Sequence, residues 1–85
     1  MNNRDIITQA IIDSHPKYEL IYNNSNQMGY YYEIYEYQKI YNQDNTNSIH
    51  WKIITSFDKY EDALNYFLDL THQTKYTIIS YGRID

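Results

Sequence analysis

The spacing of hydrophobic and polar positions changes several times along this chain, and each change predicts a new element. The first apolar positions recur at helical spacing, and they are Ile6, Ile7, Ala10 and Ile11. Asn2 or Asn3 is placed to cap such a helix, and Pro16 would end it, because the residue before a proline avoids helical angles. We therefore expect a helix over residues 3–14.

Alternating patterns follow and predict three strands. Residues 17–22 alternate between two sets of side chains and form the first short strand. Residues 29–42 carry half of the twelve tyrosines, and they predict a longer strand because tyrosine favours strands over helices. A polar loop at 42–48 then leads into a third strand at 49–55, so the three strands form an antiparallel meander.

Helical spacing returns near residue 58. The apolar stripe consists of Tyr60, Ala63, Leu64, Phe67, Leu70 and Thr71. Asp58 and Glu61 have the spacing of a capping box at its start, and residues 76–81 predict a last strand reached by a right-handed crossover. The expected fold is a single α+β domain over residues 1–85. It has the order α-β-β-β-α-β, with both helices on one face of a mainly antiparallel, three- to four-stranded sheet.

The tyrosine strand divides into two faces by parity. Ile34 and Ile40 mark the even-numbered face as the core side, but Glu36 and Gln38 on the same face contradict a perfect register. A bulge near residues 35–37, or a strand that projects beyond the helices, would resolve the conflict. A helical interpretation of the segment ranks second.

The odd-numbered face is the predicted interaction surface. Protein interfaces favour tyrosine because it gives a large contact area at low entropic cost. The predicted partner-binding residues are Tyr31, Glu33, Tyr35, Glu36, Tyr37, Lys39 and Tyr41. Neighbouring strands are expected to add Ile21, His50, Lys52 and Ile54. In the alternative interpretation, cross-strand tyrosine pairs merely stabilise an open sheet.

Composition and charge exclude several classes of function. The chain has no cysteine and only two glycines, so it offers neither a thiolate metal site nor a phosphate-binding loop. His15, His50 and His72 lie near no second metal ligand at a recognised spacing. We expect no catalytic residue, no cofactor and no metal, and therefore no enzyme. The net charge of −4 argues against general affinity for nucleic acid or anionic membranes. No apolar run approaches the length of a transmembrane helix, and residues 1–5 lack the features of a signal peptide, so we expect a cytoplasmic protein.

These features together predict a small binding protein that acts by blocking a macromolecular target. In size and composition the chain resembles the small acidic α+β inhibitors of phages and mobile elements, including those of anti-CRISPR type, and toxin immunity proteins. That resemblance implies a protein or ribonucleoprotein partner, with Glu33 and Glu36 facing a basic groove. Two alternatives stay open: a single-stranded nucleic-acid-binding protein that uses tyrosine stacking, and a homodimeric accessory protein.

Overall fold

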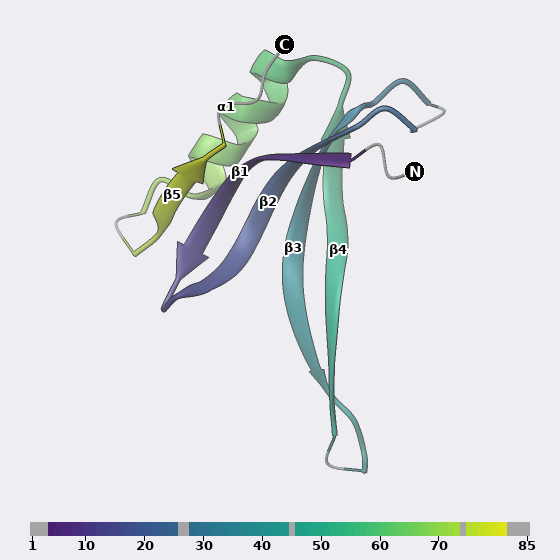
Figure 1. The fold of residues 1–85 in the computed structure, drawn as a ribbon, viewed down its shortest axis with the longest axis vertical. Helices are drawn as coiled ribbons and strands as arrows, with labels where there is room; N and C mark the ends of the chain where they lie inside the picture. The colour runs from purple at the N-terminus through teal and green to yellow at the C-terminus, as the bar shows by residue number, and fades with distance from the viewer. Residues whose placement is uncertain (1–3, 26–27, 45, 74, 82–85) are drawn as a thin grey trace.

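The computed structural model describes residues 4–25, 28–44, 46–73 and 75–81. In these ranges the chain forms, in order, strands β1 (Arg4–Ile12), β2 (His15–Asn23), β3 (Tyr32–Tyr41) and β4 (Asn47–Phe57), helix α1 (Tyr60–Leu70) and strand β5 (Thr77–Ser80). The strands make one antiparallel sheet in the order β4-β3-β2-β1-β5, and α1 packs on one of its faces (Figure 1). The predicted α+β class is confirmed, but the sheet is larger than expected and has one helix instead of two.

The predicted N-terminal helix is wrong, because this segment is the strand β1. Ile6 pairs with Ile21 and Thr8 with Leu20, so Ile7 is an extra residue in a bulge. The bulge shifts the alternation by one position, so Ile7 and Ala10 share the core face although they are three positions apart. Two core residues three positions apart have the spacing that a helix would give.

A tight turn joins β1 to β2. Ile12 pairs with His15, and the two residues between them, Asp13 and Ser14, have φ angles of 51° and 66°. Two successive residues in the left-handed region are what a two-residue type I′ hairpin turn requires. Pro16, which was expected to end a helix, instead lies near the start of β2, where a strand tolerates proline.

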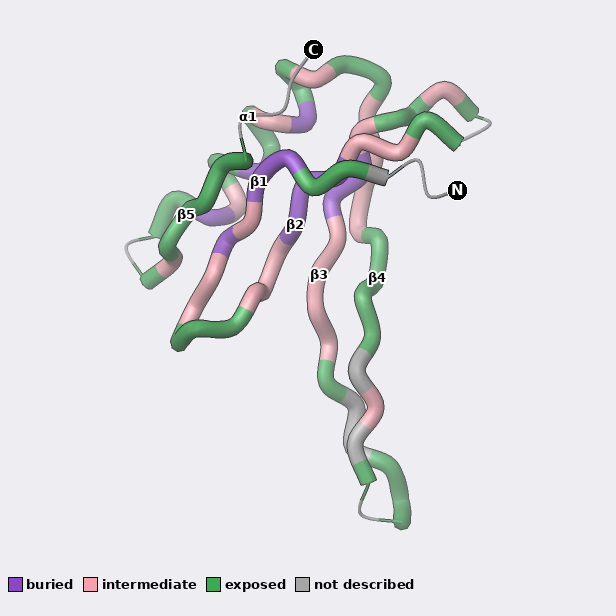
Figure 2. The backbone as a smooth tube through the Cα atoms, viewed as in Figure 1, coloured by how far each residue is buried: buried purple, intermediate pink, exposed green. Residues whose placement is uncertain are grey.

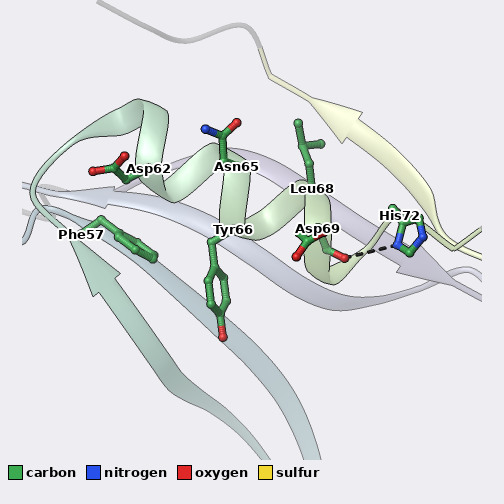
Figure 3. A pocket seen from close by; sticks show the side chains of 7 residues that line it. All are labelled: Phe57, Asp62, Asn65, Tyr66, Leu68, Asp69 and His72. Carbon is green, nitrogen blue, oxygen red and sulfur yellow. Dashed lines mark hydrogen bonds between the residues drawn. The ribbon is translucent and has the colours of Figure 1, made fainter.

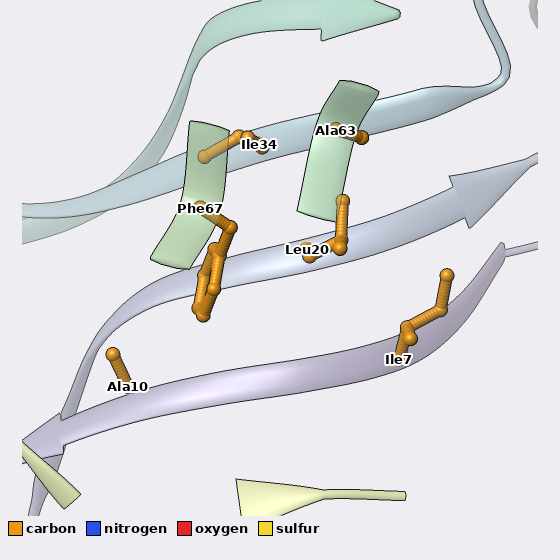
Figure 4. Packing of buried hydrophobic residues seen from close by; sticks show 6 residues of the cluster. All are labelled: Ile7, Ala10, Leu20, Ile34, Ala63 and Phe67. Carbon is orange, nitrogen blue, oxygen red and sulfur yellow. The ribbon is translucent and has the colours of Figure 1, made fainter. Parts of the chain in front are cut away.

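The core lies between α1 and the face of the sheet beneath it. Ala63 and Phe67 of α1 are completely buried against Leu20 of β2 and Ile34 of β3, which are also completely buried (Figure 4). Ile7 and Ala10 complete this cluster from β1. We call this the helix-side face, and we call the opposite surface of the sheet the outer face.

The start of α1 differs from the predicted capping box. Lys59 occupies the N-cap position and makes no side-chain capping hydrogen bond. Asp58 stands one residue too early to cap the helix, so the expected exchange between Asp58 and Glu61 is absent. At the other end, the Thr71 hydroxyl donates a hydrogen bond of 2.8 Å to the Phe67 carbonyl oxygen.

Strands β3 and β4 extend well beyond the rest of the sheet. The pairing of β2 with β3 ends at Tyr18 and Glu36, whereas β3 and β4 stay paired as far as Tyr41 and Asn47. The hairpin therefore projects as a two-stranded tip, defined here as residues 37–44 and 46–51, at the bottom of Figures 1 and 2.

The pairing of β3 with its neighbours explains the irregularity that was expected in this strand. The predicted projecting strand is present. The predicted bulge near residues 35–37 is not in β3, because the extra residue is Ile54 of the neighbouring strand β4, opposite the Ile34–Tyr35 step.

The last strand is far from the strand that precedes it in sequence. After β4, the chain passes through α1 and reaches the opposite edge of the sheet, where β5 pairs with β1. Because all neighbours are antiparallel, β4 and β5 run in the same direction. No helix within the described ranges has the length and apolar character needed to cross a membrane.

Candidate protein-binding face

The outer face is the candidate site because it is apolar although no described helix or strand covers it. Its side chains follow from the pairing, since cross-strand partners share a face. They include Trp51, Ile53 and Ser56 of β4, Glu33, Tyr35, Tyr37 and Lys39 of β3, Glu19 and Ile21 of β2, Ile6 and Gln9 of β1, Ile79 of β5, and Tyr81. A solvated face of an antiparallel sheet is normally polar, so this composition needs an explanation.

Large apolar side chains on this face are exposed near both edges of the sheet. The exposed fraction is 43% for Ile53 in β4, 40% for Ile6 in β1 and 38% for Ile79 in β5. Between them, Ile21 is buried by its neighbours. Exposed apolar surface of this breadth is typical of interaction sites.

The aromatic part of the face lies at the β3–β4 side. Tyr37 and Trp51 are cross-strand partners, and their ring centroids lie 5.4 Å apart with the planes at 75°. Edge-to-face packing of this kind holds both rings in place. Trp51 remains exposed beside Ile53, so a rigid aromatic and aliphatic surface faces outward.

Glu33 is a buried carboxylate within this apolar surrounding. Its Oε1 accepts a hydrogen bond of 2.8 Å from the Tyr35 hydroxyl and one of 3.2 Å from the Asn23 side-chain amide. Buried charges need such partners, because desolvation of an unpaired carboxylate is costly. The hydrogen bonds also fix the orientation of the carboxylate.

Glu19 is a second buried carboxylate on the same face. The Gln9 side-chain amide donates a hydrogen bond to Glu19, and Gln9 in turn accepts one from the Tyr81 hydroxyl. These bonds connect β2, β1 and the segment after β5. Among the described residues, no basic side chain lies within ion-pair distance of Glu19.

Four of the predicted partner-binding residues lie on the outer face. Glu33, Tyr35 and Tyr37 are close together there, and Lys39, which has the same parity and pairs in register with Ile49, continues this face along the tip, where it is exposed. The side chain of Tyr41 lies outside the described part of the structure.

Tyr31 and Glu36 lie apart from that group. Tyr31 precedes β3, and its ring packs edge-to-face on Tyr22, a helix-side residue, at a centroid distance of 6.0 Å. Glu36 is on the helix-side face, where it is paired in register with Tyr18 and Lys52. The sequence prediction thus combined residues from both faces.

Glu36 is held by three side chains on that other face. Its Oε2 lies 3.4 Å from the Lys17 ammonium and 3.3 Å from the Tyr18 hydroxyl, and its Oε1 accepts a 3.2 Å hydrogen bond from Gln38. Burial raises the pKa of the Glu36 carboxyl, but the Gln38 hydrogen bond and the Lys17 charge outweigh it, so this pKa lies below its usual value. Burial and the nearby Glu36 charge raise the pKa of Tyr18 to about 12.

The contribution expected from β4 is corrected by its register. Tyr37 pairs with Trp51 and Tyr35 with Ile53, so His50 and Lys52 lie on the helix-side face instead. Ile54 packs against the core. The sequence alone shows that the odd-numbered residues of β4 between 49 and 53 are apolar. Parity alone does not show on which face of the sheet they lie.

Gln9, Glu19 and Tyr81 were not predicted as parts of the site. Gln9 was hidden by the helical interpretation of its segment. Tyr81 comes to this face only because β5 pairs with β1, which is a contact between residues separated by 72 positions. Local sequence patterns carry no signal for a contact of that range.

A second concave region lies beside α1, but it is an open hollow without converging chemistry (Figure 3). Phe57 and Tyr66 form its apolar side, with ring centroids 5.5 Å apart. At the helix end, the His72 ring nitrogen Nδ1 lies 3.3 Å from the Asp69 carbonyl oxygen. Within the described ranges, no group of three or more His, Cys, Asp or Glu side chains could hold a metal ion.

Comparison of the chain with protein-family models, with curated proteins and with solved structures finds no match.

Proposed function

We propose that this protein is a small, non-enzymatic binding module that attaches through its outer face to another protein or to a ribonucleoprotein. The observation that supports the proposal is the group of exposed apolar side chains near both edges of an uncovered sheet face, represented by Trp51, Ile53 and Ile79. Removal of such side chains from water on binding provides a favourable free energy.

The carboxylates indicate the charge of the partner. Glu19 and Glu33 are fixed among apolar and aromatic side chains, where a charge interacts more strongly than it does in water. The chain also carries a net charge of −4. A basic surface would complement both features, and the proposed mode of action is inhibition by occupying such a surface. Counter-defence proteins of anti-CRISPR type and toxin immunity proteins act in this way.

The test uses two double variants with matched exposure. Trp51→Ala with Ile53→Ser alters the outer face, whereas Tyr66→Ala with Leu68→Ser alters equally exposed apolar residues on α1. Each protein would be immobilised and used to capture partners from a host lysate, with circular dichroism to confirm folding. We expect the outer-face variant to lose the captured protein and the α1 variant to retain it. Equal capture by both would refute the assignment of the face.

The single tryptophan provides a direct second measurement. Because Trp51 lies on the outer face, its fluorescence should shift to shorter wavelength when a purified partner covers the ring. The titration should weaken with rising salt if the partner is basic. An unchanged emission spectrum at saturating partner would place the contact elsewhere.

The nucleic-acid alternative makes a different prediction. Tyr37 and Trp51 could stack bases, but Glu19 and Glu33 on the same face would repel phosphates. Binding of short single-stranded oligonucleotides at low salt, measured with the same Trp51 fluorescence, would favour that alternative.

A further inference from the structure

The two edges of the sheet differ in how they are protected. Natural proteins protect edge strands by shortening them or by adding charge, proline or bulges. The β5 edge follows this rule, with four residues. The β4 edge has eleven residues, no proline and Lys52 as its single formally charged residue. Its bulge lies near one end, at Ile54, and leaves the preceding residues regular.

The backbone groups that face outward from β4 follow from the hairpin. The Asn42 N–H donates to the Thr46 carbonyl oxygen at 2.9 Å, and these two residues continue the register of β3 and β4. Hydrogen-bonded and non-hydrogen-bonded pairs alternate along an antiparallel ladder. The even-numbered residues of the β4 tip thus bond to β3. The outward-facing backbone belongs to Asn47, Ile49, Trp51 and Ile53.

The other side of β3 supports the same assignment. The Asn23 N–H donates to the Tyr31 carbonyl oxygen at 2.7 Å, in register with the pairing of β2 and β3. Odd-numbered residues of β3 therefore bond to β2, and its even-numbered residues bond to β4. The two hydrogen bonds, one on each side of β3, thus agree on which residues of β3 bond to β4.

We propose that this β4 edge pairs with the same edge of a second copy of the chain, antiparallel and two-fold symmetric about His50. The residues with outward-facing backbone run from Asn47 to Ile53, so His50 is at their centre. In this register Asn47 pairs with Ile53 of the second copy and Ile49 with Trp51, so all four outward residues are hydrogen-bonded. The Ile54 bulge ends the run at the point where the symmetric ladder ends.

The chemistry of the edge favours a second copy. β4 contains no acidic residue, so the net negative charge of the chain is carried elsewhere. The symmetric register places Lys52 opposite Ser48 of the other copy and not opposite a second lysine. The tip also projects clear of α1 and of the hairpin formed by β1 and β2, which leaves the edge open to approach (Figure 1).

The two-fold register can be tested by charge at positions 48 and 50, which lie on the helix-side face and not on the proposed binding face. Ser48→Glu would face Lys52 of the other copy twice, and we expect it to tighten the dimer dissociation constant about tenfold. Ser48→Lys should weaken it by a similar factor. At the axis, His50→Lys and His50→Glu would each place like charges together, and both should weaken the dimer about threefold.

The expected directions of change in the dissociation constant differ from those that net charge alone would cause. Repulsion between negatively charged chains alone would make Ser48→Glu weaker and His50→Lys tighter, the reverse of what the register predicts. Gln43→Glu and Gln43→Lys, in the exposed loop outside the edge, serve as matched controls and should change the dissociation constant little. Sedimentation equilibrium from micromolar to millimolar concentration should detect a species of twice the 10.4 kDa chain mass.

Amide hydrogen exchange provides an independent readout of the same register. With rising concentration, the amides of Ile49, Trp51 and Ile53 should become protected, whereas His50 and Lys52 are already bonded to β3. A monomer at millimolar concentration, or a dimer without this alternation, would overturn the proposal. The proposed binding function does not depend on this result, because a monomer would still carry a complete outer face.

Discussion

At the scale of single residues, Glu36 shows how a polar side chain can occupy the core side of a strand. Parity places it correctly on the helix-side face, and the conflict with Ile34 is visible in the sequence. The resolution is tertiary: Glu36 lies where the pairing of β2 with β3 ends, and Lys17 and Gln38 hold its carboxylate. No local pattern could say that the core stops before this residue.

The first prediction concerns the acid dependence of this contact. Glu36→Gln should lower the free energy of unfolding at neutral pH by about 0.5 kcal/mol, because the ion pair with the half-exposed Lys17 is partly screened. The pKa of Glu36 is lower in the folded protein than in the unfolded chain. Its stabilisation is therefore present above the unfolded pKa and is lost as the pH falls through the folded one.

Urea unfolding at a series of pH values measures this difference. The curves for wild type and Glu36→Gln should converge in acid, and Lys17→Gln should show the same acid-dependent loss. A difference that stays constant from neutral pH to strong acid would mean that the carboxylate charge is not what stabilises the fold.

At the scale of elements, periodicity identified α1 and the four strands that follow the first turn, and it failed at β1. At β1, the extra residue Ile7 places Ile7 and Ala10, three positions apart, on the same face, so the apolar spacing of a bulged strand matches that of a helix. Element boundaries were also displaced: β2 begins at His15 and α1 begins after Lys59. Bulges and caps depend on single backbone angles, which apolar spacing does not encode.

The second prediction uses the N-terminus of α1. Since Lys59 occupies the N-cap position without a side-chain hydrogen bond, Lys59→Ser should supply the missing acceptor for a free N–H of the first turn. We expect the free energy of unfolding to rise by about 1 kcal/mol. Thermal or urea denaturation would measure the change.

Lys59→Ala is the matched control for this substitution. It removes the same lysine and adds no oxygen, so it should not reproduce the gain. If Ser and Ala at this position gave equal stability, the helix would begin elsewhere.

At the scale of the whole molecule, the stabilising core is confined to one face of the sheet. Phe67 of α1 is the largest completely buried side chain among the described residues, and it belongs to the same core cluster as Leu20 and Ile34 (Figure 4). An 85-residue chain buries a modest fraction of its surface, so one helix carries much of the stability.

The third prediction follows from this dependence on one ring. Phe67→Ala should cost about 3–5 kcal/mol, which is a large part of the roughly 5–15 kcal/mol that stabilises a typical domain. Leu68→Ala, one position along the same helix at an exposed site, should change stability by no more than about 0.5 kcal/mol. Chemical denaturation of both variants measures the contrast. Similar losses would place the core contact of α1 on a different helix face.

The candidate face itself was predictable only in part. Tyrosine parity in β3 located Glu33, Tyr35 and Tyr37, because alternation is a local property of one strand. The register between strands decides which residues join them, and Trp51 was assigned to this face only by its pairing with Tyr37.

The position of β5 has a consequence for biosynthesis. β1 is synthesised before β5, yet the edge of β1 that faces away from β2 is paired only by β5. The two segments are some 70 positions apart, as the contact between Gln9 and Tyr81 shows. A nascent chain must therefore wait, with β1 lacking one neighbour, until the ribosome has released the segment after α1. Closing so long a loop slows folding, and an incomplete edge can pair with other chains during that delay.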